Sequence, residues 1–476
     1  MAPDHNGNAP TADEPTTDGL TTVVLSPPPT PNGPLHLGHL SGPYLAADIA
    51  VRAARRRGDK VFALCGLDDH QNYVQAKARQ EHTPATELRG RNADLIRAVF
   101  DRAGIVHDGF TQPLTDSGYR ATVVEFLEDL ALAGALPIEE WHTPVCQDCP
   151  GILHHAYVTG GCPQCGATSG GGTCEGCAGY TPAAALTDPH CTRCGLPATA
   201  RRLVRGPVLR LEDHRAVLEA AWQRATLPPT ARRLATRLLQ GPLPTVPFSY
   251  PTDWGIELPS IPGHRVDVWA EMGLGYLHTV GQHLAPGATG LDEHLRAWRK
   301  VGALWAFLGL DNAFYYLALF PALFAAAGLP ADVLTGLVVN EFYRLDGAKF
   351  STSRSHAVWA HEFLDTEDPR AVRAFLSWDR PAPRPANFTL ERYRALTATW
   401  TDPARATPAD PAELARAEQA LTFEHFDAAL AARCLLGAGL PTGTTGSTGS
   451  TGGSVPADDL LTVLTGGTGD TKAAGQ

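Results

Sequence analysis

The sequence predicts an α/β fold built on a doubly wound parallel sheet, and two neighbouring features predict it. A short β-branched run at residues 21–26 passes through a turn rich in proline and glycine into helical apolar spacing over residues 42–58. A second apolar run, residues 60–66, follows at once. Strand, turn, helix and strand at this length form a βαβ unit, which closes right-handed and brings the turn after each strand to the carboxyl edge of the sheet. We therefore expect ligands to bind at that turn.

Composition and pattern divide the 476 residues into six segments. The first is polar and rich in proline, aspartate and threonine, so we expect a disordered arm without a signal peptide. The last is rich in glycine, threonine and serine, which favours a flexible tail. The predicted segments are the arm at 1–20, the first half of the α/β domain at 21–109, a connective insertion at 110–247, the second half at 248–360, a helical tail at 361–438 and the low-complexity tail at 439–476.

Further helices and strands are expected from the insertion onward. They are a strand turning into a helix over residues 203–222, a helix from about Leu291, a strand from about Leu334, a helix over 361–378, and two helical patterns over 411–423 and 426–437. About seventy-five residues after Thr401, many of them small and polar, cannot build a large helical domain.

The most apolar stretch, residues 301–328, is long enough to raise the possibility of a membrane helix. Asp311, Asn312 and Pro321 argue against that interpretation, because an intramembrane aspartate without a partner is costly. We interpret the stretch as a buried strand flanked by two helices, with Asp311 at a strand end. The formal net charge of −11 indicates no overall basic surface, and we expect neither DNA nor a membrane as a partner and the cytoplasm as the compartment.

Eight of the ten cysteines form CxxC pairs, which is the most specific signal in the chain. Each pair suits a tight knuckle that presents two thiolates to a tetrahedral metal, so four pairs predict two structural zinc sites. Disulfides are the alternative, but they need an oxidising compartment. Adjacent pairs are expected to share a metal, although three pairings are possible, and Cys65 and Cys434 are interpreted as buried fillers. The predicted ligands are Cys146, Cys149, Cys162, Cys165, Cys174, Cys177, Cys191 and Cys194.

Two histidines lie three residues apart in the turn TPNGPLHLGHL, residues 30–40. If a helix begins near residue 35, His36 and His39 share a face of its first turn, where free N–H groups attract phosphate. They could instead be capping or surface histidines, or half of a metal site. Asp68 and Asp69 follow the second strand, so a cation such as an amino group could be held beside the turn. The turn lacks GxGxxG and GxxxxGK[ST], so the sequence supports neither dinucleotide nor P-loop chemistry there.

The sequence PNGPLHLGH followed by FALCGLDDH resembles the catalytic domain of class I aminoacyl-tRNA synthetases of the methionyl type, a Rossmann-like fold, and the resemblance extends over residues 21 to about 400. It implies that ATP, with Mg²⁺, and an amino acid react to form an aminoacyl adenylate. His36, Gly38 and His39 would bind ATP. Lys349 in the loop AKFSTSR would cover the departing pyrophosphate, with Ser351 and Ser353 beside it. The implied amino-acid site is Pro28, Thr30, Asp68, Trp269, Tyr276 and Tyr316, with Asp68 on the ammonium group.

Departures from the family pattern cluster around the substrate. Thr352 replaces the second lysine of the loop, and a hydroxyl cannot supply that charge unless Arg354 substitutes for it. The family usually has an aromatic residue at Thr30 and a small one at Met272. Pro28, Gly273 and Tyr316 also depart from it, whereas Trp269 and Tyr276 match. Tyr250 and Pro251 stand in place of an arginine and an aspartate. Because synthetase pockets discriminate by fit and by paired polar groups, we expect methionine not to be secure as the substrate.

The sequence therefore predicts ATP-dependent activation of an amino acid by a methionyl-tRNA synthetase-like ligase, which passes it to tRNA or to another acceptor. Anticodon recognition is expected to need a partner, because the helical tail is short. One alternative is a genuine methionyl-tRNA synthetase with a minimal C-terminus. The other is a catalytically inactive binding paralogue, which Thr352 favours and the retained His36, His39, Asp68 and Lys349 oppose. A valyl or isoleucyl relative is disfavoured, because the insertion consists mainly of knuckles.

Overall fold

The computed structural model describes residues 20–330, 332–350, 356–400, 410–436 and 457–466. Within them, the central sheet has five parallel strands, which confirms the predicted α/β fold. In spatial order the strands are β15 (Leu334–Asn340), β14 (Val301–Gly309), β1 (Thr21–Leu25), β2 (Val61–Gly66) and β3 (Gly109–Thr111). The chain moves outward from β1 to β2 and β3, whereas β14 pairs on the other side of β1. The strand order therefore reverses between β1 and β14, and such a reversal opens a ligand crevice at the carboxyl ends of the strands.

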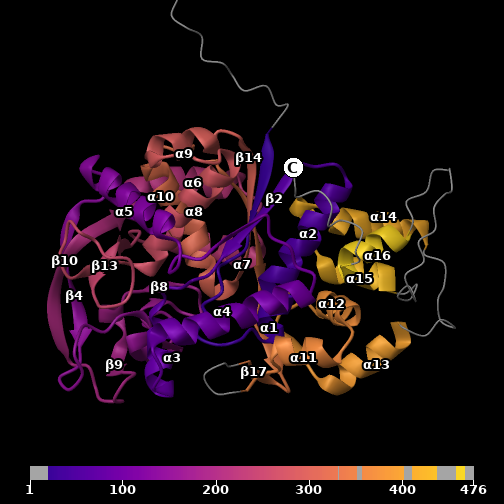
Figure 1. Cartoon of the computed structure of the whole chain (residues 1–476), viewed down its shortest axis with the longest axis horizontal. Coiled ribbons are helices and arrows are strands. Elements are labelled where there is room, and N and C mark those ends of the chain that lie inside the picture. The colour runs from indigo at the N-terminus through magenta and orange to yellow at the C-terminus, as the bar shows by residue number, and fades with distance from the viewer. Residues whose placement is uncertain (1–19, 331, 351–355, 401–409, 437–456, 467–476) are drawn as a thin grey trace, which may run out of the picture.

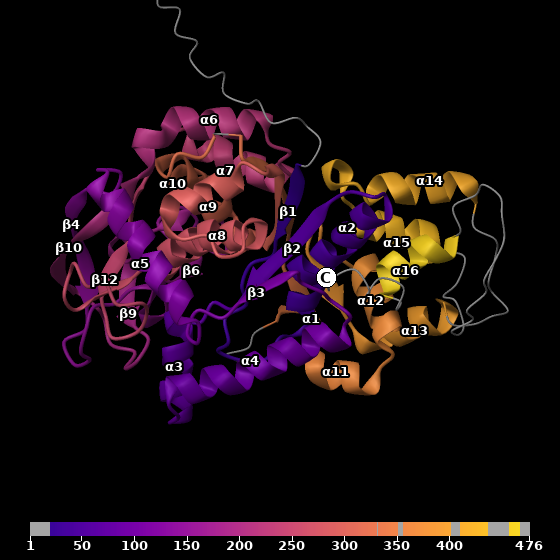
Figure 2. The ribbon, with the colours of Figure 1, turned by 45° about the horizontal axis from the view of Figure 1, so that its top comes forward.

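Both faces of the sheet are covered, because successive residues of a strand point to opposite sides. On β1, Val23 and Leu25 join a core with one group of helices, while Val24 packs on alanines of α2. Figures 1 and 2 show the first group on one side of the sheet and α2 on the other. The first group comprises α5 (Ser117–Leu132), α8 (Val268–Leu284), α9 (Gly290–Trp298) and α10 (Phe320–Ala326), and α2 is Leu45–Arg56. All the strands at the centre are thus buried on both faces, as parallel sheets require.

The first half of the domain carries the βαβ unit that the sequence predicts. The turn after β1 leads into α1 (Leu37–His39), a π-helical turn η1 (Leu40–Tyr44) and then α2. Gly58 follows α2 with a φ of 88°, a left-handed conformation that glycine adopts without a steric penalty. Beyond β2 come α3 (Asn72–Glu81) and α4 (Ala85–Arg102), which pack against each other.

The insertion is an antiparallel unit beside the sheet (Figure 1). Its three longer strands are β4 (Ile138–Val145), β10 (Ala200–Arg210) and β11 (Thr245–Pro247). Short strands carry the cysteines: β5 (Val158–Gly161), β6 (Thr168–Ser169), β7 (Gly172–Thr173), β8 (Tyr180–Thr181) and β9 (Thr187–Cys191), with single turns η2 (His155–Tyr157) and η3 (Ala183–Ala185). The expected change from strand to helix is confirmed, because β10 leads through η4 (Leu211–His214) into α6 (Arg215–Arg224), and α7 (Pro229–Leu238) follows.

The apolar stretch at residues 301–328 is a buried strand followed by helical turns, which confirms the interpretation against a membrane span at that point. It comprises β14, η5 (Leu310–Asn312), η6 (Tyr315–Leu319) and α10, and Asp311 lies directly after the strand. Before it the chain forms β12 (Ser249–Pro251), β13 (His264–Val266) and α8. Among all described residues, none of the helices combines the length and the apolar character that a membrane crossing needs.

Beyond β15, a small sheet of β16 (Tyr343–Leu345), β17 (Ala348–Lys349) and β18 (Ala386–Phe388) leads to the C-terminal helices. They are α11 (Ala360–Thr366), α12 (Pro369–Trp378), α13 (Leu390–Trp400), α14 (Pro411–Ala420), the turn η8 (Phe423–His425), α15 (Ala428–Leu436) and α16 (Ala457–Thr465). The single helix expected over residues 361–378 is wrong. Pro369 starts a new helix, and the Asp368 side chain caps it by accepting the N–H of Arg370 at 2.9 Å.

A buried ion pair ties these C-terminal helices to the catalytic sheet. Nη2 of Arg373 on α12 lies 2.6 Å from Oδ2 of Asp48 on α2, and both side chains are almost fully buried. The same guanidinium donates to the backbone oxygens of Ala103 (2.9 Å) and Leu464 (3.1 Å). Figure 2 shows α12, α15 and α16 gathered beside α2. One arginine therefore joins α12, α16, α2 and the end of α4.

Candidate active site

The turn after β1 presents the two predicted histidines at the carboxyl edge of the sheet. His36 is the N-cap of α1, and its Nδ1 accepts the backbone N–H of His39 at 3.2 Å. Nδ1 of His39 accepts the N–H of His36 in return, at 3.3 Å, which completes a reciprocal capping box. The two rings stack with centroids 3.6 Å apart. A Cβ at Gly38 would lie 3.0 Å from Nδ1 of His36, so a larger residue there would crowd this stack.

The protonation of the two rings follows from their surroundings. Burial lowers the pKa of His39 to about 4, with a further contribution from the charge of Lys349. Burial lowers the pKa of His36 still further, and the neighbouring His39 adds to the shift. Both rings are therefore neutral near pH 7. Since each Nδ1 is an acceptor, the proton of each neutral ring sits on Nε2, and neither Nε2–H group donates to a described residue.

The segment after the loop closes over the histidine turn. The N–H of Leu37 donates to the oxygen of Val358 at 3.0 Å, and the N–H of Ala360 donates to the oxygen of Leu35 at 2.8 Å. Phe350 stacks on His36 with ring centroids 4.9 Å apart. The backbone bonds form an isolated bridge between His36 and the segment before α11, so the loop starts and ends beside the histidines.

Lys349, at the end of β17, forms an ion pair with Glu175 of the insertion. Its Nζ also lies 4.4 Å from the centroid of the Phe342 ring, within range of a cation–π contact. Glu175 stands between Cys174 and Cys177, so the tip of a cysteine knuckle reaches the loop lysine. The remaining predicted loop residues, Ser351 and Ser353, and the departures Thr352 and Arg354, lie outside the described residues.

Asp68 follows β2 and faces the crevice. Its Oδ2 accepts the hydroxyl of Thr30 at 2.9 Å, and its N–H donates to the oxygen of Pro29 at 3.1 Å. Burial raises the pKa of Asp68 to about 7, and the charges of Glu271 and Asp69 contribute to the rise. A cation placed beside this carboxylate would relieve the cost of burying its charge.

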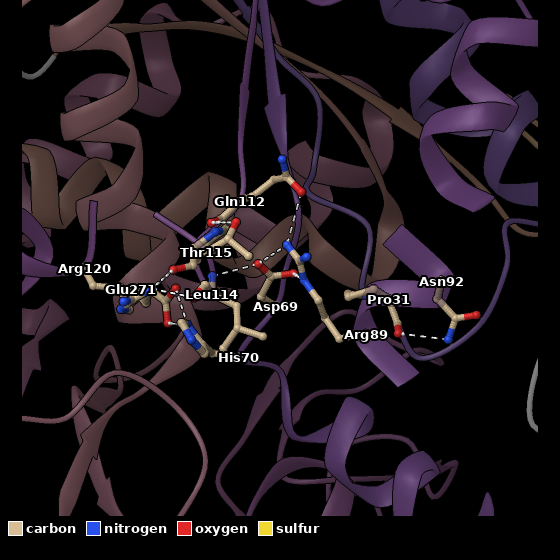
Figure 3. A network of polar contacts seen from close by, with 11 residues as sticks. Pro31, Asp69, His70, Arg89, Asn92, Gln112, Leu114, Thr115, Arg120 and Glu271 are labelled. Carbon is tan, nitrogen blue, oxygen red and sulfur yellow. Dashed lines mark hydrogen bonds and ion pairs between the residues drawn. The ribbon is translucent and has the colours of Figure 1, made fainter. Parts of the chain in front are cut away.

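Asp69 does not share that role, because a network behind the crevice occupies it (Figure 3). Its two carboxylate oxygens accept a bidentate pair of bonds from Arg89, both of 2.7 Å, and the N–H of Leu114 adds a third at 2.9 Å. The next residue, His70, pairs with Glu271 of α8 at 2.9 Å, and both side chains are buried. Glu271 favours the charged imidazole and so raises the pKa of His70 against the opposing effect of burial. The two pairs leave Asp68 as the carboxylate available to a ligand among these three.

A small cavity of about 20 Å³ lies beside Asp68 between β2 and α8. Of the predicted amino-acid site, Pro28, Asp68 and Tyr276 line it. Tyr316 lies behind the wall, with its hydroxyl 2.5 Å from that of Tyr276, and Thr30 reaches the site through Asp68. Trp269 does not line this cavity and instead stacks on Tyr315, with ring centroids 3.5 Å apart.

The cysteines form two four-residue groups, and within each group all Sγ atoms lie within 4.8 Å of one another. Each group could hold a metal ion, because four thiols at this spacing offer a tetrahedral donor set. The expectation that adjacent pairs share a metal is wrong for the outer pairs. One group is Cys146, Cys149, Cys191 and Cys194, and the other is Cys162, Cys165, Cys174 and Cys177. The inner group is thus nested inside the outer one.

Two ion pairs were not predicted from the sequence, namely His70 with Glu271 and Lys349 with Glu175. Glu271 is the single carboxylate in the apolar helix sequence VWAEMGLGYL, and His70 directly follows the paired aspartates. A lone charge inside an apolar helix requires a buried partner, which is a signal that could have pointed to this pair. The contact between Lys349 and Glu175 had no such signal, because it depends on how the insertion folds back.

Comparisons with known protein sequences match this chain to one family. The family model described as "tRNA synthetases class I (M)" matches residues 22–399. The methionine–tRNA ligase of Methanobrevibacter smithii is 29% identical over 370 residues, which are 77% of this chain and 54% of the relative. That of Thermomicrobium roseum is 30% identical over 397 residues, covering 78% of this chain and 65% of the relative. The chain thus spans between about half and two thirds of the length of these relatives.

The fold has a counterpart among solved structures. The crystal structure of Mycobacterium tuberculosis methionyl-tRNA synthetase bound by methionyl-adenylate matches with a TM-score of 0.67 at 17% identity, over 87% of this chain and 81% of that one. At this identity the likeness speaks for the fold alone. The family match over residues 22–399 shows that the chain belongs to the class I tRNA synthetases of the methionyl group.

Proposed function

We propose that the protein activates an amino acid with ATP, forming an aminoacyl adenylate and pyrophosphate, and passes the aminoacyl group to tRNA or to another acceptor. One observation carries the proposal. At the reversal point of a parallel sheet, a histidine turn with two N–H donors that bond to no described residue lies beside a buried carboxylate that forms no ion pair with a described residue. Donors of that kind suit phosphate, and the carboxylate suits an ammonium group.

Activation requires the substrate carboxylate to attack the α-phosphorus of ATP while pyrophosphate leaves. Nε2–H of His36 and of His39 would donate to phosphate oxygens, where negative charge grows in the transition state. Because the capping box fixes both rings, these donors need no reorganisation at the moment of reaction. Asp68 would hold the ammonium group and so orient the attacking carboxylate, which makes positioning part of the rate enhancement.

Lys349 would leave Glu175 and bind the departing pyrophosphate, supplying positive charge. Ser351 and Ser353 are proposed to bind ATP from the same loop, and Gly38 to let ATP approach the turn. Mg²⁺ would accompany ATP, bound mainly by its phosphates. Pro28, Thr30, Trp269, Tyr276 and Tyr316 remain our proposed amino-acid site together with Asp68.

Each four-cysteine group is proposed to hold one Zn²⁺, with a structural role, since four thiolates leave no coordination position open. We expect purified protein to contain about two zinc ions per chain. Cys191→Ser, which removes a buried ligand of the outer group, should lower the content to about one. Elemental analysis measures this, with Cys65→Ser as the control because Cys65 is a buried cysteine outside both groups. Zinc-free wild-type protein, or a Cys191→Ser variant with unchanged content, would contradict the assignment.

The acceptor remains part of the proposal. The relatives are named methionine–tRNA ligases, which favours tRNA as the acceptor and makes a methionyl-tRNA synthetase the second candidate function. A small amine or hydroxyl acceptor would also suit an adenylate-forming site. We propose the cytoplasm as the compartment, where ATP and both kinds of acceptor are available.

Amino-acid-dependent exchange of pyrophosphate into ATP tests the proposal without tRNA. Purified protein is screened across the standard amino acids, and exchange with at least one of them is expected. Absence of exchange with all of them, in protein that carries its zinc, would overturn activation of a standard amino acid and favour the inactive binding paralogue. Adding total tRNA to a positive reaction then asks whether the aminoacyl group reaches tRNA.

A further inference from the structure

We propose that the amino-acid site is built for a small side chain, of the size of alanine or serine, and that Met272 is the residue that excludes longer ones. The inference rests on the proposed function, because it identifies the class of amino acid that the same site accepts. It is carried by the walls of the cavity beside Asp68.

The cavity offers little room. Its volume of about 20 Å³ compares with roughly 10–15 Å³ for a single water site. A methyl or hydroxymethyl group is of that size, whereas the side chain of methionine has four heavy atoms in a row. The floor and walls are the buried residues Leu64, Cys65, Tyr119 and Tyr276, none of which is more than 5% exposed.

Met272 supplies the wall on the α8 side. It is 8% exposed, and its Sδ lies 3.9 Å from the hydroxyl of Tyr316. Because Tyr316 also bonds to Tyr276 at 2.5 Å, it supports both Met272 and Tyr276 from behind the wall. Met272 and Tyr276 line the cavity together with Asp68.

The helix that carries Met272 is closely packed against its neighbours. On the next residue, Gly273, a Cβ would lie 2.6 Å from a methyl of Leu323 and 3.0 Å from the ring of Phe320, so α8 is pressed against α10. At Gly275 a Cβ would lie 2.1 Å from the hydroxyl of Tyr119. Helix α8 therefore cannot shift outward or inward without displacing close-packed side chains, and interiors packed in this way resist such shifts.

Charge in the cavity points to the same substrate class. Asp68 and Glu271 both line it, and Glu271 is already paired with His70. The carboxylate of Asp68, which forms no ion pair with a described residue, suits the ammonium group that all amino acids share. No described lysine or arginine lines the cavity, so a side-chain carboxylate would find no counter-charge. A small neutral side chain satisfies both conditions.

Competition between alanine, serine and methionine tests the inference. For the wild-type chain, kcat/KM in pyrophosphate exchange is expected to be at least about 100-fold higher with alanine or serine than with methionine. Met272→Ala should raise kcat/KM for methionine at least about tenfold, because it opens the wall. Met272→Leu, which conserves volume, is the matched control and should keep the wild-type preference. Both variants are compared in thermal unfolding, so that a damaged fold is recognised.

Equilibrium binding of the free amino acids by calorimetry separates this inference from the proposed function. If alanine or serine binds and methionine does not, the inference stands even where exchange fails, and the failure then belongs to the catalytic step. Preference of the wild-type chain for methionine, in binding or in exchange, would overturn the inference while leaving amino-acid activation intact. Binding of no small amino acid would overturn it as well.

Discussion

Replacing His36 and His39 together with alanine is expected to lower pyrophosphate exchange by about 10³-fold or more. Each ring holds its Nδ1 against a backbone N–H, which leaves two Nε2–H donors for the phosphates. Removing one preorganised donor from a developing charge typically lowers kcat by about 10²–10³-fold, and the effects of two donors that act together are not additive. We therefore expect each single variant to account for most of the loss in the double variant.

His36 and His39 also form the capping box of α1, and losing it should change the stability of the fold far less than the activity. Loss of an N-cap typically costs about 1 kcal/mol of stability, so the double variant should stay folded and keep its zinc. His107→Ala is the matched control. His107 is a half-buried histidine whose ring packs 5.1 Å from that of Phe100, and burial lowers its pKa to about 4, as it does for His39. If His107→Ala lowers exchange as strongly as His39→Ala does in equally folded protein, the catalytic role of the turn is wrong.

Lys349→Ala is expected to lower kcat for exchange by about 10²–10³-fold, with little change in the affinity for the amino acid. By our proposal, the ammonium group would neutralise charge that develops on the leaving pyrophosphate, whereas the amino acid would bind at Asp68 on another part of the crevice. Steady-state exchange at varied ATP and at varied amino acid separates the two quantities. A variant that loses affinity for the amino acid and keeps its kcat would contradict the proposed role of Lys349 at the leaving pyrophosphate.

Two further variants sharpen this test. Lys300→Ala removes a lysine whose Nζ donates to the oxygen of Leu284, away from the loop, and should leave exchange unchanged. Glu175→Gln releases Lys349 from its partner without removing its charge. Because both side chains of that pair are partly exposed, the pair contributes only about 0–1 kcal/mol, so this variant should bind ATP as well as the wild type or a few-fold more tightly.

The first strands and helix of the central sheet could be predicted from the sequence, because their apolar patterns are local. Successive side chains of the strand at residues 21–25 point to opposite faces, so its apolar residues reach both sides of the sheet. Gly58 ends the following helix. The βαβ unit can therefore be predicted from consecutive stretches of sequence. The histidine turn and Asp68 were placed at one edge by the same logic, since carboxyl ends of parallel strands share an edge. The predicted βαβ unit, and the placement of the histidine turn and Asp68 after its two strands, agree with the structure.

Features that depend on contacts between distant parts of the chain could not be predicted from the sequence. The four CxxC pairs are equivalent in sequence, and their nesting is decided by β5 pairing with β9, which brings Cys191 back to the start of the insertion. The split between α11 and α12 has a local cause instead. A capping residue and a proline override a continuous helical pattern there. The narrow cavity beside Met272 depends on the packing of α8 against α10, which no single stretch of sequence contains.

The ion pair between Arg373 and Asp48 limits how this protein can be divided. Asp48 lies on α2, which follows the histidine turn, yet its partner comes from α12, 325 residues later. Removing one member of a buried pair typically costs about 3–5 kcal/mol, which is a large part of the stability of an ordinary domain. A chimera that joins this catalytic domain to the C-terminal helices of another synthetase must therefore carry a matching arginine and acceptor oxygens. Its boundary belongs beyond the last residue that Arg373 contacts, and not at the end of the catalytic loop.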